Sequence, residues 1–416
     1  MKDKSNYSKI YMIAGCFPPF GRGNAITNMC VANGLSREFD LTVVCMHRND
    51  GGVISYQDDQ SLVEGLNENI NVNRIKAANW WGINTLLYVL GIFPCYFFNW
   101  TYSVIKERRR LFNTPGVIFA VYPVFSDLVI GYIISRIYDW PLLIDFRDDF
   151  SGVMSRNWRR IFRRLYIYLE KKIVNKASHI TVTTNGLKND LISRYSLEKK
   201  KITVVYNIVP PSIKKEDRPD YREPSSHPLL ILYAGAMSFV QRPEILLLAQ
   251  KHLCDKDSNW TSRIRIELYG PLNPYFRLKV KPYLAQNCLY KGFVPQNIVA
   301  DRLRITDIGF LSLSDSIYSY ATPTKLFDYI ENGVPIVASL PPGASRDIIE
   351  EYKIGLVADI GDIEGLARQL KRMVEEDVLR AECRKNMGQI RELFSTKSQI
   401  DRWKDILIGL KVAKIN

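Results

Sequence analysis

Short apolar runs alternate with amphipathic segments along this chain of 416 residues. The runs have the length and composition of buried strands, and the segments between them repeat apolar residues at helical spacing. The first series predicts strands at 10–15, 41–46, 70–77, 117–122, 142–146, 180–184 and 202–207. The second series predicts strands at 230–235, 264–270, 289–294, 308–313, 335–340 and 355–358. This alternation is typical of parallel sheets covered by helices, so we predict two α/β domains.

The segment 208–228 separates the two series. It contains five prolines and many charged residues but no apolar periodicity, which indicates an interdomain linker. We therefore predict an N-terminal domain over 1–207 and a C-terminal domain over 229–395. A last helical pattern lies in the terminal segment 396–416.

Basic residues outnumber acidic ones, with 57 Lys and Arg against 43 Asp and Glu and a formal net charge of +14. This excess favours an anionic partner, such as a nucleotide, a nucleic acid or an acidic membrane surface. The chain has neither zinc-finger spacing nor an aromatic RNA-binding signature, so we expect no nucleic acid. The seven cysteines are scattered and never spaced C-x-x-C, which indicates reduced thiols in a cytosolic protein. The polar N-terminus leads directly into a strand, so we expect no signal peptide.

The segment 318–339 holds the most informative candidate site, with the sequence YSYATPTKLFDYIENGVPIVAS. Thr322 as N-cap and Pro323 as first helical residue predict the start of a helix. Backbone N–H groups without helical partners then lie around Thr324 and Lys325, at the positive end of the helix dipole. These features together predict an anion site that contains a lysine.

Asp328 follows Lys325 by three residues, so the two side chains share one face of the predicted helix. Gly333 ends that helix before a buried strand. A cation and a helix start could bind a diphosphate, and a carboxylate one turn on could bind ribose hydroxyls. An ordinary αβ unit with a solvated lysine and aspartate is the alternative.

Two further candidate sites follow strands of the first series. Gly21 and Gly23 lie in the loop CFPPFGRGN, where glycines let backbone N–H groups approach a ligand. The sequence DFRDDF places Asp145, Arg147 and Asp148 at the carboxyl end of a buried strand, which faces the ligand crevice in open α/β sheets. This cluster is either catalytic or a structural ion pair.

Two segments of the first domain suggest contact with a membrane. The run 77–105 carries no charged residue, which leaves three interpretations: a spanning helix, a helix pair facing a membrane or acceptor, or plain core. The segment 157–177 is an amphipathic helical pattern with a cationic face. That face is either merely solvated or apposed to anionic lipid.

These blocks, in this order, resemble the GT-B glycosyltransferases, and within them the family 4 branch. The most specific block is ATPTKLFDYIENGVPIVAS, which looks like the phosphate-binding segment of bacterial sugar transferases that make surface polysaccharide. Supporting blocks are FPPFGRGN, IDFRDDF, ITVTTNGLKNDLISRY and LYAGAMSFVQRPEILLLA. The resemblance covers nearly the whole chain. It implies two Rossmann-like domains facing a cleft, with the C-terminal helix returning to the first domain.

The resemblance also implies roles for individual residues. Arg242 and Lys325 would bind the donor diphosphate, and Asp328 would hold the ribose. The implied donor-binding residues are Gly21, Gly23, Val294, Thr322, Thr324, Lys325 and Asp328. Asp145, Arg147 and Asp148 would lie near the acceptor. The chain departs from the family pattern at Met237, where an arginine is usual, and at Tyr320, where a glutamate is usual.

The predicted function is transfer of a sugar from a nucleotide diphosphate, UDP rather than GDP, to a glycan or lipid-linked glycan. The resemblance implies retention of anomeric configuration, with Arg242, Lys325 and Asp148 as the catalytic residues. No cofactor and no metal are expected, and the protein would act as a peripheral protein on the inner face of the plasma membrane. A nucleotide-sugar 2-epimerase and a non-catalytic membrane-associated scaffold of polysaccharide assembly are the alternatives.

Overall fold

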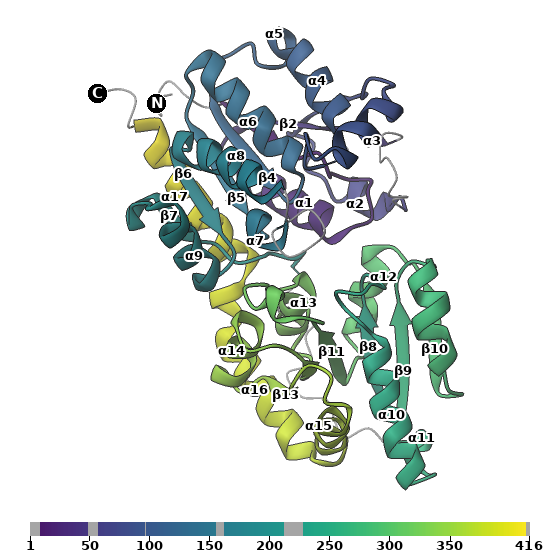
Figure 1. Ribbon diagram of the computed structural model, residues 1–416. Helices are drawn as coiled ribbons and strands as arrows, with labels where there is room; N and C mark the ends of the chain where they lie inside the picture. The colour runs from purple at the N-terminus through teal and green to yellow at the C-terminus, as the bar shows by residue number, and fades with distance from the viewer. Residues whose placement is uncertain (1–8, 49–56, 96, 155–161, 212–227, 413–416) are drawn as a thin grey trace. The chain divides into compact units, whose positions relative to one another are not determined.

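The computed structural model describes residues 9–48, 57–95, 97–154, 162–211 and 228–412 (Figure 1). Contacts divide the chain into two compact units, Met1–Asn207 with Lys397–Asn416, and Ile208–Thr396. Each unit contains one parallel sheet with helices, which confirms the predicted α/β class. Most of the predicted linker, residues 212–227, lies outside the described residues.

Seven parallel strands form the sheet in the described part of the first unit, in the order β3-β2-β1-β4-β5-β6-β7. They are β1 (Lys9–Ile13), β2 (Asp40–Met46), β3 (Asn71–Ile75), β4 (Val117–Tyr122), β5 (Leu142–Phe146), β6 (His179–Val182) and β7 (Ile202–Val204). The central strands are buried along their whole length because helices cover both faces of a parallel sheet.

The helices of the first unit connect these strands (Figure 1). They are α1 (Gly23–Leu35), α2 (Gln60–Glu64), α3 (Trp81–Val89), α4 (Phe98–Lys106), α5 (Arg108–Leu111), α6 (Phe125–Tyr138), α7 (Phe150–Met154), α8 (Arg163–Lys176), α9 (Asn185–Tyr195) and, from the end of the chain, α17 (Thr396–Val412).

Helix α17 packs against the sheet of the first unit, which confirms the predicted return of the C-terminal helix. The indole of Trp403 is fully buried and donates from Nε1 to Thr181 Oγ1 on β6 at 3.3 Å. Gln399 Oε1 accepts from the Tyr206 backbone N–H at 3.0 Å. Burying an aromatic side chain of this size contributes about 1.5–3 kcal/mol, so Trp403 fixes the helix to the sheet.

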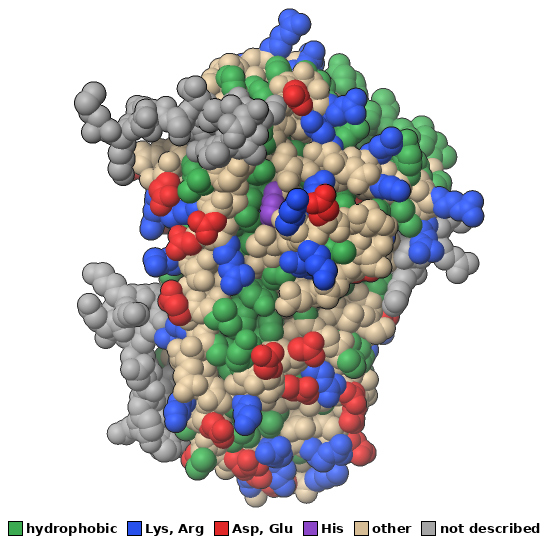
Figure 2. Space-filling view, turned by 90° about the vertical axis from the view of Figure 1, so that its left-hand side faces the viewer, with side chains coloured by type: hydrophobic (Ala, Val, Ile, Leu, Met, Phe, Trp, Pro, Cys, Tyr) green, Lys and Arg blue, Asp and Glu red, His purple; other side chains and the backbone are tan. Residues whose placement is uncertain are grey.

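The uncharged run 77–105 forms two short helices, α3 and α4, of nine residues each. Helix α4 buries Trp100 and Val104, so this half of the run is core. Along and just after α3, by contrast, five apolar side chains are 47–55% exposed: Ile83, Leu86, Val89, Leu90 and Ile92. No helix in the described ranges has both the length and the apolar character needed to cross a bilayer. On the face seen in Figure 2, hydrophobic side chains gather at the upper right edge and near the middle, and Lys and Arg side chains are spread among Asp and Glu.

Six parallel strands form the sheet in the described part of the second unit, in the order β10-β9-β8-β11-β12-β13. They are β8 (Leu229–Ala234), β9 (Ile264–Tyr269), β10 (Cys288–Gly292), β11 (Ile308–Ser312), β12 (Ile336–Ser339) and β13 (Gly355–Ala358). The helices are α10 (Glu244–Lys256), α11 (Trp260–Arg263), α12 (Gln296–Leu303), α13 (Thr324–Asn332), α14 (Ala344–Glu351), α15 (Ile363–Glu375) and α16 (Asp377–Phe394).

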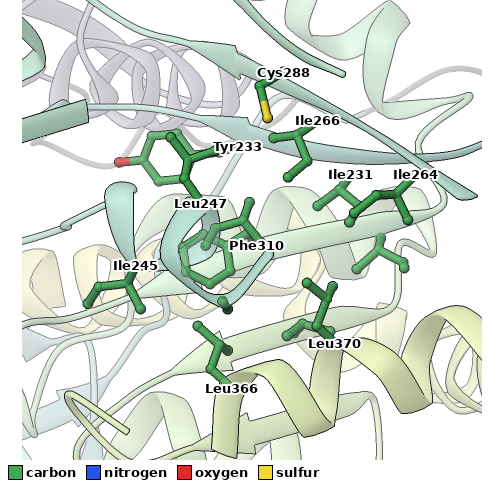
Figure 3. Packing of buried hydrophobic residues seen from close by; sticks show 14 of the residues in the cluster. Ile231, Tyr233, Ile245, Leu247, Ile264, Ile266, Cys288, Phe310, Leu366 and Leu370 are labelled. Carbon is green, nitrogen blue, oxygen red and sulfur yellow. The ribbon is translucent and has the colours of Figure 1, made fainter. Parts of the chain in front are cut away.

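The core of the second unit lies between the sheet and helices α10 and α15. Apolar side chains of β8, β9 and β11 meet those of the two helices in one buried cluster (Figure 3). The ring of Tyr233 belongs to this cluster, but its hydroxyl points away from the other labelled side chains. Tyr233 therefore connects the core to the polar groups above the end of β8.

Candidate active site

The strand order of the second unit reverses direction between β8 and β11. In open parallel sheets the connections at such a point leave toward opposite faces, and a crevice opens at the carboxyl ends of the two strands. The segments that follow these ends are the loop 235–243 and the loop 313–323, which leads into α13. The candidate site is built from these two loops and the first turns of α13.

Lys325 is the central residue of this site. Its side chain is buried, with 6% of the residue exposed, and its Nζ donates to Gln241 Oε1 at 2.5 Å. The same ammonium lies 4.1 Å from the ring centroid of Tyr233, within range of a cation–π contact. A Cβ at Gly235 would lie 2.9 Å from the Nζ, and the φ of Gly235 is +154°. A glycine at the end of β8 therefore leaves room for the lysine.

Hydrogen bonds from two neighbouring segments hold the loop after β8 in place. Ser312 Oγ at the end of β11 donates to the Gln241 backbone carbonyl, and Ser314 N donates to Val240 O at 2.9 Å. Asn273 Nδ2 donates to Met237 O at 2.8 Å. These contacts hold Gln241 in position, a role that the sequence did not indicate.

Arg242 follows Gln241 and has a left-handed backbone, with φ of 28°. Its Nε donates to Glu244 Oε1 at 3.0 Å, and its side chain is 39% exposed. Glu244 is buried and also accepts from the Tyr275 hydroxyl, at 2.8 and 2.9 Å. The predicted contact of Arg242 with a diphosphate stays a prediction, because in this structure its partner is a carboxylate.

The start of α13 differs from the prediction by one residue. Its N-cap is Pro323, with extended ψ of 145° and no side-chain cap, so Thr322 as N-cap was wrong. Thr322 is instead a buried residue of the preceding loop, and Thr324 is the first helical residue. Pro323, which was predicted as the first helical residue, instead lies outside the helix because its ψ is extended. Gly333 ends the helix in the left-handed conformation, as predicted.

Tyr329 fixes α13 to the sheet. Its hydroxyl lies 3.1 Å from Leu232 O on β8 and 3.0 Å from Phe310 O on β11, so it bridges the two strands. A Cβ at Gly309 would lie 2.7 Å from the Tyr329 ring, which explains the glycine there. The two strands at the crevice and the helix over it thus form one rigid element.

Lys325 and Asp328, two of the charged residues of α13, influence each other's pKa. Burial lowers the pKa of Lys325 to about 7, and the carboxylate of Asp328 opposes that shift. Burial also raises the pKa of Asp328 to about 7, while Lys325 lowers it and Glu331 raises it. Asp328 remains partly exposed, so solvent moderates its shift. A bound anion would raise the pKa of Lys325 and hold it charged.

The remaining donor-side predictions lie on loops of both units. Val294 is partly exposed in the loop after β10, just past Gly292, which has a φ of 75°. In the first unit, Gly21 N donates to Gln57 O at 2.8 Å, and Gly23 is the first residue of α1. The structure brings together Lys325, Thr322, Thr324 and Asp328, and the ligand contacts of all these residues stay predictions.

The Asp145–Arg147 pair is part of the buried interior of the first unit. Arg147 Nε donates to Asp145 Oδ2 at 2.7 Å, and both side chains are almost fully buried. Asp145 Oδ1 accepts from Thr181 Oγ1 at 2.7 Å. The Nη1 and Nη2 atoms of Arg147 are buried and find no hydrogen-bond partner in the parts of the chain that the structure describes. Asp148, the next residue, is partly exposed.

A second ionic cluster, which was not predicted from the sequence, joins the residue before α7 to α8 and α9. Arg194 donates from Nη1 and Nη2 to Asp149, at 2.8 and 2.9 Å. The Tyr195 hydroxyl donates to Glu170 Oε2 at 2.5 Å, and burial raises the pKa of Glu170 to about 7. Because Asp149, Glu170 and Arg194 lie in three segments separated in sequence, only the fold brings them together.

Two Rossmann-like units, each built on a parallel sheet with helices, define the GT-B class of architecture. Family models agree: residues 31–213 match "Glycosyltransferase Family 4", and residues 214–389 match "Glycosyl transferases group 1". The chain therefore belongs to the GT-B glycosyltransferases of the family 4 and group 1 type.

Solved structures support the same fold. Sucrose-phosphate synthase from Thermosynechococcus elongatus is similar over 97% of this chain and 99% of its own, with TM-score 0.70 and 14% identity. HepE from Anabaena, in complex with UDP and glucose, is similar over 96% and 98%, with TM-score 0.67 and 15% identity. WaaG, a glycosyltransferase involved in lipopolysaccharide biosynthesis, is similar over 96% and 100%, with TM-score 0.65 and 15% identity. No protein of curated function matches the sequence.

Proposed function

We propose that this glycosyltransferase transfers a sugar from a UDP-sugar to a hydroxyl of a glycan or lipid-linked glycan, with retention, during surface polysaccharide synthesis. The observation that carries the proposal is the buried ammonium of Lys325 beside the start of α13. HepE has been solved with UDP and with UDP-glucose, and WaaG acts in lipopolysaccharide biosynthesis. These relatives support a uracil nucleotide and a surface glycan for this chain.

The chemistry proposed for the site is stabilisation of a leaving diphosphate. As the glycosidic bond breaks, the diphosphate gains negative charge and the sugar becomes oxocarbenium-like. Lys325 and the backbone N–H groups of Thr324 and Lys325 would stabilise that charge from fixed positions, without reorganisation. Asp328 would hold the ribose, one helical turn away. Arg242 would join the diphosphate by leaving Glu244.

In the single-step route to retention that we propose, the acceptor attacks from the face that the diphosphate leaves. In this proposal a phosphate oxygen takes the proton of the acceptor hydroxyl, so no histidine base is needed. Asp148 would orient that hydroxyl, with the Asp145–Arg147 pair beneath it in the same segment. No metal and no cofactor are part of the proposal.

The first unit would hold the enzyme at an anionic membrane, where a lipid-linked acceptor is found. The exposed apolar side chains along and just after α3 are close in the chain to Gly91, where a Cβ would come within 2.2 Å of the ring of Phe162, the residue before α8. Helix α8 exposes Arg163 and Arg164 in its first turn. Apolar insertion and attraction to anionic lipid would therefore act at one place. Arg159 and Arg160 of the predicted helix lie outside the described residues.

Nucleotide binding tests the donor assignment first. Thermal shift with UDP, GDP, ADP and their sugars should show the largest stabilisation for the UDP ligands, and Lys325→Met should remove it. Binding that is unchanged in Lys325→Met would contradict the assignment. Undetectable binding of every nucleotide by calorimetry would favour the scaffold alternative.

Product analysis tests the reaction. With UDP-sugar and a glycan acceptor, NMR should show UDP release and a product that keeps the anomeric configuration of the donor. An epimerase would instead make a new sugar nucleotide from UDP-N-acetylhexosamine when no acceptor is present. An inverted product would contradict retention while leaving the transferase assignment intact.

A further inference from the structure

Lys325 is a buried cation whose hydrogen-bond partner is neutral. Among the described residues it forms no close ion pair, although the Asp328 carboxylate acts on it electrostatically, and the acceptor of its Nζ is the side-chain amide of Gln241. Its other contact is the face of the Tyr233 ring. A buried charge normally has a counter-ion, so this arrangement leaves the charge available to an incoming anion.

Gln241 is itself held in a fixed geometry. The Tyr233 hydroxyl lies 3.2 Å from Gln241 Oε1 and donates to the Ala236 carbonyl. Ser312 Oγ donates to the Gln241 backbone carbonyl. Because Gln241 is fixed by both its backbone and its side chain, its amide can define where the lysine ammonium lies.

We propose that Gln241 is a positioning residue, which holds the Lys325 ammonium at the start of α13 for the donor diphosphate. The inference rests on the proposed function, since the anion is the diphosphate of the donor. An amide suits this role better than a carboxylate would, because it orients the ammonium without neutralising it. A carboxylate at the same place would compete with the diphosphate for the lysine.

Several titratable groups face this ammonium or its neighbours. From α13 itself come Asp328, which raises the pKa of Lys325, and Tyr329, which donates to the backbone of the sheet. From β8 comes Tyr233, whose pKa burial raises well above its usual value, so it stays neutral. Glu244 lies near Tyr233 but is paired with Arg242 and Tyr275. Burial lowers the pKa of Lys325 to about 7 despite Asp328.

Three variants separate positioning from simple packing. Gln241→Ala removes the acceptor, and Gln241→Glu keeps the shape but adds a charge. Gln286→Glu adds the same charge at an exposed position of the same unit and is the matched control. We expect UDP affinity at pH 7 to fall about tenfold in Gln241→Ala and about tenfold or more in Gln241→Glu, with no change in Gln286→Glu.

The pH dependence of UDP affinity distinguishes positioning from packing, because a packing defect alone would not change the pKa of Lys325. UDP binding to the wild-type protein should weaken as pH rises above about 7, because Lys325 loses its proton. In Gln241→Glu the new carboxylate raises the pKa of Lys325, so this loss should move to higher pH by about one unit or more. Equal affinities and equal pH profiles in wild type, Gln241→Ala and Gln241→Glu would overturn the inference.

A measurement without nucleotide keeps the inference distinct from the proposed function. The pKa of Lys325 is lower in the folded than in the unfolded state, so the unfolded state binds more protons between about pH 7 and 10.5. Stability from this group therefore rises with pH across that window, and Gln241→Glu should flatten the rise relative to Gln286→Glu. If wild type binds no nucleotide, the proposed function fails, yet the flattened rise would still support the Gln241 contact. Identical pH profiles of unfolding in the two variants would overturn it.

Discussion

Lys325 in the second unit and Arg147 in the first are both buried cations, with 6% and 7% of each residue exposed. Each lies in a segment that follows a parallel strand, at the edge of the sheet where ligands bind in such folds. Their partners differ. Arg147 is paired with the carboxylate of Asp145 at 2.7 Å, whereas Lys325 has the neutral amide of Gln241.

The two cations differ in how much of their charge and how many of their N–H donors remain available to a ligand. Asp145 also accepts from Thr181, which in turn accepts from Trp403 of α17, so the Asp145–Arg147 pair is part of the packing of that helix. Arg147 keeps only its two Nη atoms without partners among the described residues. Burial of a cation therefore does not by itself indicate a ligand site. The partner of the cation is more informative, because a neutral amide leaves the positive charge uncompensated whereas a carboxylate compensates it.

The largest expected effect is the loss of stability when the Asp145–Arg147 ion pair is broken. Arg147→Met leaves Asp145 as an uncompensated buried charge, which should lower the free energy of unfolding by about 3–5 kcal/mol. Urea denaturation would measure it. The double variant Asp145→Asn with Arg147→Met removes both charges and should recover most of that loss. Equal destabilisation of the single and double variants would mean that Arg147 acts through its packing alone.

The next effect tests the Lys325 side. Lys325→Met breaks no close ion pair among the described residues, although it removes the longer-range attraction to Asp328. Stability should therefore change much less than in Arg147→Met, while turnover falls about 10²–10³-fold through loss of charge stabilisation. Steady-state kinetics and urea denaturation on the same sample would show both results. Lys385→Met changes an exposed lysine of α16 and should alter neither. Near-normal turnover in folded Lys325→Met would remove the lysine from the chemistry.

Strands were predictable because buried parallel strands are continuous apolar runs with polar ends. The run VIFAVY was predicted as a strand, and β4 (Val117–Tyr122) has the same limits. The run 77–105 shows the limit of such reasoning, because its composition is uniform while α3 and α4 have opposite burial. Which half of an apolar segment meets the core depends on the rest of the fold.

The candidate site was predictable only where its residues are close in sequence. Lys325 and Asp328 share a helix, and Gly333 has a local signature in the C-cap. Gln241 was missed because it contacts Lys325 across 84 positions, from a loop whose sequence shows only a polar residue. The N-cap at Thr322 was wrong because the helix begins one residue later than the local preferences of threonine and proline indicate, after an extended Pro323.

A smaller effect is expected for Asp328, and it distinguishes the role of this carboxylate from that of Lys325 on the same helix. Asp328→Asn should raise the donor KM about tenfold, with a smaller change in kcat, because ribose contacts change little while the glycosidic bond breaks. Donor saturation curves at fixed acceptor concentration would measure both constants. A fall in kcat with unchanged KM would instead assign the carboxylate to the chemical step.

The smallest effect per residue concerns cations that are exposed rather than buried. Arg163 and Arg164 of α8 are solvated, so each should contribute only about 1 kcal/mol, and only next to an anionic surface. Charge reversal of both to glutamate should therefore release the protein from anionic vesicles in a sedimentation assay, and turnover on a soluble acceptor analogue should be unaffected.

Leu86→Ser and Leu90→Ser, in the exposed apolar set along and just after α3, test the apolar insertion. These substitutions should weaken vesicle binding even at high salt.

Salt concentration separates the electrostatic attraction from the apolar insertion in membrane binding. It also distinguishes solvated cations, which salt screens, from buried ones. The attraction of Arg163 and Arg164 is screened over about 8 Å at physiological ionic strength, so vesicle binding should weaken as salt rises. The diphosphate contact of Lys325 lies in a buried site and should depend on salt much less. The charge-reversal variant should lose the vesicle binding that is strongest at low salt, while its UDP binding should keep the salt dependence of the wild type. If wild type ignores anionic vesicles even at low salt, the first turn of α8 is a solvated face, and the acceptor meets the enzyme away from the bilayer.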